Sequence, residues 1–269
     1  MNLLIFLAFV LGLIVGSFLN VVILRWPKGQ SLQGRSHCAH CGHSLSPRDL
    51  VPVLSYIFLN GKCRFCGEKI SPRYFYVEAA TGILFAACAA YFTPFDFQSV
   101  LVFFRAAFIV SVLIVVFMTD LEHFLILDKV VLHGAAVLLI FNLAIDLVQK
   151  NPFFPSLALI GALSSAGLFA FFGALYYFSN GKWIGFGDAK FALFLGLATP
   201  FPFILANVFL AYALGAVAGI FLILFAGKKL VSRIPFGVFL SASTLIALFY
   251  GAALVSGYAR AVGIYGLRY

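Results

Sequence analysis

The acidic residues are the first place to look for chemistry, because the chain contains only nine of them. Asp120 follows an apolar stretch, and Asp188 lies in the string Gly185-Phe186-Gly187-Asp188-Ala189-Lys190. A carboxylate at the edge of an apolar segment is costly to desolvate and is therefore a functional candidate. Two such groups that meet share a proton, so one can act as a general base toward water and the other as a general acid toward a leaving amine. That combination can hydrolyse a peptide bond without a metal at the reaction centre.

Four residues around these aspartates are candidates for supporting roles. Gly185 and Gly187 would let the backbone come close to another chain, such as an extended peptide. Lys190 could tune the pKa of Asp188 or bind a lipid phosphate, and the sequence leaves both interpretations open. Asp128 could cap the helix that follows it or support the active site.

The cysteines give a second signal, because four of them form two CxxC pairs separated by 21 residues. The pairs are Cys38 with Cys41 and Cys63 with Cys66. A glycine follows each pair, as in a zinc knuckle, and four thiolates suit tetrahedral Zn²⁺. We therefore expect these four cysteines to bind a structural zinc ion. Two disulfides, unliganded thiols or another metal are the alternatives. Three histidines beside the first pair could replace a ligand: His37, His40 and His43.

The composition indicates that lipid surrounds most of the chain. Hydrophobic residues make up 63% and charged residues only 10%, against about 25% charged residues in a soluble domain. Four uncharged runs and three apolar segments with isolated ionisable groups predict an all-α polytopic membrane protein with about eight transmembrane helices. The uncharged runs are 1–24, 156–179, 191–226 and 234–259. A turn at Thr199–Pro202 divides the run 191–226 into two helices. The apolar segments with ionisable groups are about 74–93, 98–119 and 130–148.

The pattern of charge predicts the organisation of the chain. We expect a retained first transmembrane helix over 1–24, a cysteine-rich insertion over 25–73 and a transmembrane body over 74–269. The insertion contains eight basic and two acidic residues, so the positive-inside rule places it in the cytoplasm. Eight spans then place the loops near 120–129, 180–190 and 227–233 on the same side, together with both aspartates. Topology and contact with anionic membrane lipids explain the basic residues, and we expect no nucleic-acid partner.

Several segments of the sequence resemble the bacterial type IV prepilin peptidase family, whose members are membrane aspartic proteases of the GxGD type. The resemblance covers nearly the whole chain. It departs from the family at Leu127 and Val238, where the family often has proline. The matching segments are Gly16–Val22, Asp49–Tyr56, Ile70–Tyr74 followed by Glu78, Asp120 with Asp128, Gly185–Lys190 and Ile234–Gly237.

The resemblance implies an enzyme of the bacterial inner membrane whose catalytic residues are Asp120 and Asp188. It implies that the enzyme removes the leader peptide from prepilins and pseudopilins on the cytoplasmic side. A second activity is also implied, in which the new N-terminal amino group is methylated from S-adenosylmethionine. No glycine-rich motif locates the binding site of that methyl donor, and the role of Glu78 stays open.

Two other functions are consistent with parts of this pattern. A proton-coupled transporter could use the two aspartates as a relay, although such proteins place ionisable groups near the middle of the bilayer between repeated halves. A zinc-dependent assembly protein could use the helices as an anchor, but it would leave the two aspartates unexplained.

Overall fold

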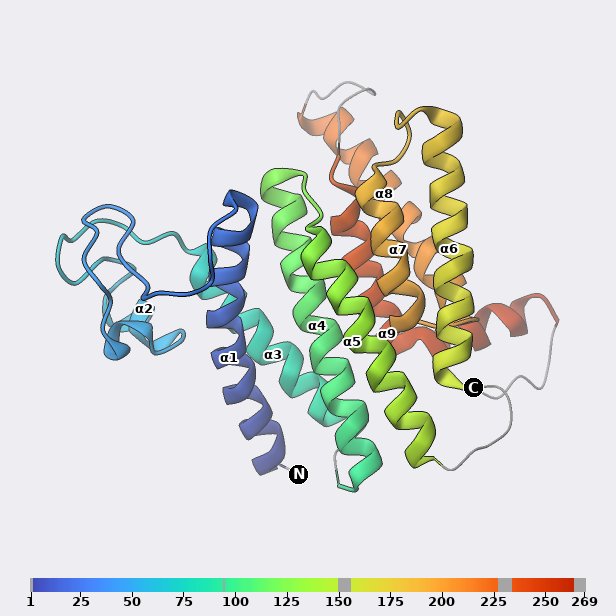
Figure 1. Cartoon of the computed structure of the whole chain (residues 1–269), viewed down its shortest axis with the longest axis horizontal. Coiled ribbons are helices and arrows are strands. Elements are labelled where there is room, and N and C mark those ends of the chain that lie inside the picture. Colours follow the sequence, from blue (N-terminus) through green and yellow to red (C-terminus); the bar gives the residue numbers. More distant parts are fainter. Residues whose placement is uncertain (1, 94, 150–155, 227–233, 264–269) are drawn as a thin grey trace. The chain divides into compact units, whose positions relative to one another are not determined.

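The computed structural model describes residues 2–93, 95–149, 156–226 and 234–263 of the chain (Figure 1). Within these ranges the protein is helical and has no β-strand, only two isolated bridges between single residues. The expected all-α architecture is confirmed. The described elements are α1 (Asn2–Arg25), η1 (Trp26–Lys28), η2 (Pro47–Leu50), α2 (Leu54–Phe58), α3 (Arg73–Phe92), α4 (Phe97–His123), α5 (Asp128–Val148), α6 (Leu157–Ser179), α7 (Phe186–Ala198), α8 (Phe203–Ala226) and α9 (Phe236–Ala261).

Seven of the described helices are long and apolar enough to cross a membrane: α1, α3, α4, α5, α6, α8 and α9. The remaining expected span, which starts at residue 191, corresponds to α7. This helix has 13 residues, and at about 1.5 Å per residue it is about 20 Å long. It is therefore shorter than the hydrocarbon core of a bilayer, which is about 30 Å thick. The expected loop over 227–233 lies outside the described residues.

The chain divides into two compact units, Met1–Val115 and Val116–Tyr269, so that the boundary falls within α4. The domain limits expected from the sequence lie close to two helix ends, because α1 ends at Arg25 and α3 begins at Arg73. The assignment of separate roles to those three segments stays a prediction.

In the first unit, α1 and α3 pack with their backbones in close contact. A Cβ atom on Gly12 would lie 2.7 Å from the carbonyl oxygen of Thr81, and one on Gly16 would lie 2.8 Å from the Cα atom of Glu78. Small residues at such positions let two membrane helices approach closely. One turn further along, the Asn20 side chain donates a hydrogen bond of 3.1 Å to the carbonyl oxygen of Tyr74. Glycine packing and this bond fix how the two helices pair.

In the second unit, α7 is packed among α5, α6 and α9 (Figure 1). Nine of its 13 residues are buried, and the side chains of Phe191 and Phe194 are completely buried. A Cβ atom on Gly196 would lie 2.2 Å from the backbone nitrogen of Ser165 in α6. α7 is too short to cross a bilayer, but protein surrounds it along most of its length. The ends of this helix therefore need not face lipid.

The C-terminal end of α7 is held by polar side chains of its neighbours. The last carbonyl groups of a helix have no partner within the helix and must find one elsewhere when they are buried. Asn142 of α5 donates at 3.2 Å to the carbonyl oxygen of Leu197, one of the last four of α7. One turn earlier, Ser165 of α6 donates to the carbonyl oxygen of Leu193 at 2.7 Å. These bonds fix the depth of α7 and thus the position of its first turn.

A buried polar cluster joins α8 and α9 to the end of α7. The Asn207 amide donates 3.0 Å hydrogen bonds to the hydroxyls of Thr199 and Thr244, and its oxygen accepts one of 2.6 Å from Ser243. All four side chains are almost completely buried. Because each hydroxyl and amide finds a partner, the cluster links three helices at little desolvation cost.

Candidate functional site

Asp120 lies in the last turn of α4 and caps the beginning of α9. Only 5% of it is exposed. Its Oδ2 atom accepts a hydrogen bond of 3.2 Å from the backbone N–H of Val238, in the first turn of α9. The residue at the N-cap position is Pro235, whose side chain cannot accept a hydrogen bond. The carboxylate therefore supplies the acceptor that the helix lacks, and the helix dipole favours a negative charge at that end.

Asp188 lies in the first turn of α7 and is 8% exposed. Its Oδ2 atom accepts a hydrogen bond of 3.1 Å from the backbone N–H of Gly185, the N-cap residue. A Cβ atom on Gly185 would lie 3.1 Å from the same oxygen, so any larger residue would crowd the carboxyl group. Each carboxyl group is thus held by a backbone N–H group at a helix beginning, Asp120 at that of α9 and Asp188 at that of α7.

The two carboxyl groups are close enough to influence each other electrostatically. Burial, together with the neighbouring Asp120 carboxylate, raises the pKa of Asp188 to about 7. The side chain of Ile126 lies against both helix beginnings, because Cβ atoms on Gly187 and on Gly237 would each lie 3.2 Å from it. The structure therefore brings the two acidic segments together, and near neutral pH a proton is available on Asp188.

Lys190 and Asp128 form an ion pair next to the aspartates. The Lys190 Nζ atom lies 2.6 Å from Oδ2 of Asp128, and the ammonium group also lies over the ring of Phe186, 5.0 Å from its centre. Asp128 is the first residue of α5, and the N-cap position belongs to Leu127. Of the two roles considered for Asp128, its position does not fit that of the N-cap. The ion pair instead joins the beginning of α5 to the first turn of α7.

Two backbone knuckles of the same geometry hold the four cysteines. In the first, the N–H of Cys38 donates to the carbonyl of His43, and the N–H of Gly42 donates back to the carbonyl of Cys38. In the second, Cys63 pairs with Glu68 and Gly67 in the same way. Gly42 and Gly67 have φ angles of +70° and +71°, in the left-handed region that suits glycine.

The four thiols converge on one point. Their sulfur atoms all lie within 4.8 Å of one another, and those of Cys38 and Cys66 are 3.9 Å apart. Four sulfurs at about 2.3 Å from a tetrahedral zinc ion are about 3.8 Å from each other, so the cluster fits a metal of that size. All four cysteines are free rather than disulfide-bonded. Among the described residues, no histidine joins this cluster.

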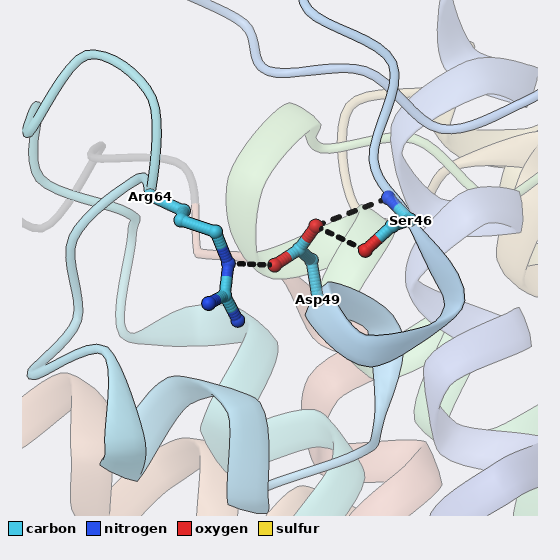
Figure 2. A network of polar contacts seen from close by, with 3 residues as sticks. All are labelled: Ser46, Asp49 and Arg64. Carbon is cyan, nitrogen blue, oxygen red and sulfur yellow. Dashed lines mark hydrogen bonds and ion pairs between the residues drawn. The ribbon is translucent and has the colours of Figure 1, made fainter.

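A polar network connects the second knuckle to the rest of the insertion (Figure 2). The Asp49 carboxylate accepts hydrogen bonds from the backbone N–H and the hydroxyl of Ser46, at 3.1 and 2.6 Å, and forms an ion pair of 2.7 Å with Arg64. The Ser46 hydroxyl and the Arg64 guanidinium lower the pKa of Asp49 to about 2. Because Arg64 lies between Cys63 and Cys66, this pair ties the knuckle to the η2 turn.

Comparisons with known proteins identify relatives of this chain. The model of the bacterial peptidase A24 N-terminal domain matches residues 10–92, and that of the type IV leader peptidase family matches residues 107–220. The prepilin leader peptidase/N-methyltransferase of Bacillus subtilis is 31% identical over 261 residues, which cover 94% of this chain and 96% of the relative. The chain belongs to the type IV leader peptidase family. The leader peptidase model includes both Asp120 and Asp188, and the N-terminal model includes the four-cysteine cluster.

Other members of the family carry the same name. The relative from Myxococcus xanthus is 36% identical over 227 residues, which cover 82% of this chain but only 63% of the relative. The relative from Aeromonas hydrophila is 30% identical over 94% of this chain and 92% of its own length. None of these relatives is named as a transporter, and no solved structure gives a significant match. The transporter alternative therefore has no support.

Some residues of the site were not identified from the sequence. Val238 was noted only as a departure from the family pattern, and Gly237 only as part of a matching segment, yet both lie against the Asp120 carboxylate. Tyr212 of α8 lies close enough for the charge of Asp188 to act on its hydroxyl. These residues carry no charge, and their positions depend on how α8 and α9 pack. Apart from the Ile234–Gly237 match, nothing in the sequence therefore indicated that they lie near the aspartates.

Proposed function

We propose that this chain is a membrane aspartic endopeptidase that removes the leader peptide from type IV prepilins and pseudopilins. The observation that carries the proposal is the pair of buried carboxyl groups, Asp120 and Asp188, each bonded to a backbone N–H at the beginning of a helix. The substrate class comes from the names of the relatives, which are prepilin leader peptidases. No other pair of buried aspartates occurs among the described residues.

The two aspartates have different roles in hydrolysis. Asp120 is the general base, since the backbone N–H of Val238 and the positive end of α9 stabilise its negative charge. It takes a proton from the water that attacks the scissile carbonyl group. Asp188 holds a proton near neutral pH and gives it to the leaving amine, which makes it the general acid. The proton taken by Asp120 then passes to Asp188, so that Asp120 is again ionised and Asp188 again protonated for the next turnover.

Gly185 and Gly187 are proposed to leave the backbone beside Asp188 open to an extended substrate strand. Lys190 and Asp128 act as positioning residues. Their ion pair holds the beginning of α5 against the first turn of α7, so that the Asp188 carboxyl group keeps its place. In this interpretation neither Lys190 nor Asp128 exchanges a proton with the substrate.

The names of the relatives also support a second activity, N-methylation of the processed pilin. S-adenosylmethionine is the proposed donor and supplies a methyl group bonded to a positively charged sulfur. The first unit contains a buried carboxylate, Glu78, and a buried amide oxygen, Oδ1 of Asn20, that has no partner within the described part of the chain. Such acceptors suit a ligand that carries positive charge.

The metal of the four-cysteine cluster is proposed to be zinc, bound by Cys38, Cys41, Cys63 and Cys66. Its role is structural, because the cysteines fill all four positions of a tetrahedral ion and leave none for water or substrate. The insertion contains only short helical turns and few buried apolar side chains. A small segment of this kind needs a metal to stay folded.

We place the enzyme in the bacterial inner membrane, with its active site facing the cytoplasm and lipids around its helices. The support is the excess of basic residues in the insertion and in the segment 180–190 that follows α6, where Lys182 and Lys190 outnumber Asp188. Incubation of the purified enzyme with a prepilin, followed by mass spectrometry, tests the peptidase and the methyltransferase together. Loss of the leader and a gain of one methyl group are expected. A prepilin that stays intact with the wild-type enzyme would refute the peptidase.

A further inference from the structure

Glu78 is a buried acid in the membrane-spanning helix α3 that takes no part in the proposed peptidase. Only 8% of it is exposed, and no cation pairs with it among the residues that the structure describes. Its Oε2 atom accepts a hydrogen bond of 2.8 Å from the backbone N–H of Val53, and its side chain also interacts with that of Ser17. An ionised carboxylate offers about four acceptor positions, so about half of its capacity is unused.

A second unused acceptor lies on the facing helix. Asn20 of α1 is 2% exposed, and its Nδ2 atom donates to the carbonyl of Tyr74, but its Oδ1 atom has no partner among the residues that the structure describes. Tyr74 and Glu78 are four residues apart on α3, so they share a face of that helix. Ser17 and Asn20 are three residues apart on α1 and face them. The two acceptors therefore lie about one helical turn apart, on facing sides of the α1–α3 pair.

A purely structural role accounts for only part of this arrangement. The bond from Glu78 holds Val53, a β-branched residue with a φ angle of +62°, in a conformation that such residues rarely adopt. That bond uses one acceptor position of the carboxylate. It does not explain why the Oδ1 atom of Asn20 is buried without a donor, since buried polar atoms nearly always have a partner.

The chemistry of the two acceptors narrows the choice of ligand. An ionised carboxylate and an amide oxygen accept hydrogen bonds and donate none, and the Asn20 NH₂ group is already bonded to the carbonyl of Tyr74. A primary ammonium group is a compact charge with three donors and no acceptor, which matches them. Calcium and magnesium ions need about six or more oxygen ligands, and this site provides too few.

We propose that Glu78 and Asn20 form a binding site for a primary ammonium group that takes part in N-methylation. This proposal rests on the proposed methyltransferase activity. Two participants in that reaction carry such a group. The first is the pilin after its leader is removed, whose new α-ammonium group would give one proton to the Glu78 carboxylate before the free amine accepts a methyl group. The second is S-adenosylmethionine, through the ammonium group of its amino-acid portion. Both bring the same chemistry to the site, and binding experiments separate them.

The first experiment uses the full-length wild-type enzyme in detergent and needs no variant. Binding of a peptide with the mature pilin N-terminus is compared with that of its N-acetylated form, which lacks the charge. Binding of S-adenosylmethionine is compared with that of its deaminated analogue. A preference of about tenfold for the charged member of one pair is expected, because hydrogen bonds to charged groups are stronger than neutral ones. The pair that shows the preference identifies the ligand, and equal binding within both pairs would overturn the proposal.

Variants then assign the preference to the two residues. Glu78→Gln and Asn20→Ala are both expected to abolish it, so a folding defect in one variant does not leave the site untested. Thr81→Val is the matched control, because Thr81 is a fully buried polar residue of α3 whose hydroxyl bonds only to its own helix, at the carbonyl of Val77. Thermal unfolding of each variant reports whether it is folded. A preference that survives in folded Glu78→Gln would refute the site.

Failure of the site and failure of the methyltransferase give different results. A wild-type enzyme that prefers the charged ligand but transfers no methyl group would refute the activity and leave an ammonium site. An enzyme whose Glu78→Gln variant methylates pilin at the wild-type rate and affinity would refute the site and leave the activity.

Discussion

The carboxylate of Asp120 accepts a hydrogen bond of 3.2 Å from the backbone N–H of Val238, a residue 118 positions later in the chain. This bond joins the end of α4 to the beginning of α9 and fixes one of the two acids at the end of a helix dipole. Asp188 stands in the same relation to the beginning of α7, through the N–H of Gly185. The two acids are thus held by rigid backbone rather than by flexible side chains, which is what a preorganised catalytic pair requires.

Replacement of either acid by its amide tests the catalytic pair. Asp120→Asn and Asp188→Asn are each expected to reduce leader removal by about 10³-fold or more, since general acid–base catalysis contributes about 10²–10⁴-fold. Gel analysis of prepilin processing measures the loss. Asp96→Asn is the control, because Asp96 is an exposed acid that bonds only to Ser99 and to its own turn. Normal processing by both variants would rule out the pair.

The pH dependence of leader removal follows from the shared proton. The pKa of Asp188 is raised to about 7 by burial and by the Asp120 carboxylate. Below this pH Asp188 keeps the proton that the leaving amine needs, and above it the proton is lost. We therefore expect kcat/KM to fall as the pH rises through about 7, toward tenfold lower per pH unit. A rate that stays constant between pH 7 and pH 9 would contradict the assignment of Asp188 as the acid.

Gly237→Ala tests how tightly the backbone surrounds the pair. The added Cβ atom would lie 2.8 Å from Oδ2 of Asp120, so the carboxylate or α9 must move. A misplacement of about 1 Å can reduce a rate by about 10²-fold, and we expect a loss of that order in the rate of prepilin cleavage. Gly167→Ala is the control, because nothing lies within 4 Å of its added atom. Equal activity of the two variants would show that the close approach is not needed.

Removal of the metal tests the cysteine cluster. Purified protein is expected to contain one zinc ion per chain by elemental analysis, and Cys63→Ser to lose most of it. Chelation is expected to unfold the insertion and to reduce methylation more than leader removal, since the aspartates lie in the other unit. Mass spectrometry of processed pilin follows both reactions in one sample. Equal loss of both activities would contradict the assignment of methylation to the first unit and leader removal to the second.

Asn207→Leu tests the polar cluster between α7, α8 and α9. The substitution removes the amide that donates to the hydroxyls of Thr199 and Thr244, which keep only their bonds to the carbonyls of Leu195 and Leu240. Interhelical hydrogen bonds in membranes contribute about 0.6 kcal/mol on average, with a maximum of about 1.7. We expect the free energy of unfolding to fall by about 1–2 kcal/mol, measured by denaturation in mixed detergent. Ser256→Ala is the control, since its exposed hydroxyl bonds only to the carbonyl of Ala253 within α9. An unchanged stability of Asn207→Leu would show that the cluster does not hold these helices.

The sequence by itself determined the features that depend on local pattern. Long runs without charge require helices in lipid, because the backbone must satisfy its own hydrogen bonds there, and seven of the eight expected spans appear. The CxxC spacing places two thiols on each turn, and the structure brings all four together. Counting of spans predicted that Asp120 and Asp188 lie on one side of the membrane, which agrees with their closeness in the structure.

Only the tertiary structure decided what surrounds these residues. The end of α7 at Ala198 agrees with the turn expected at Thr199–Pro202, but no pattern within 191–226 reveals the hydrogen bonds that Asn142 and Ser165 donate to its carbonyl groups. The pairing of Asp128 with Lys190 links positions 62 residues apart, and the unpaired oxygen of Asn20 becomes visible only once α1 and α3 are packed. Hydrophobic periodicity reports which segments leave water, but the partner of each polar atom depends on distances between helices, which only packing fixes.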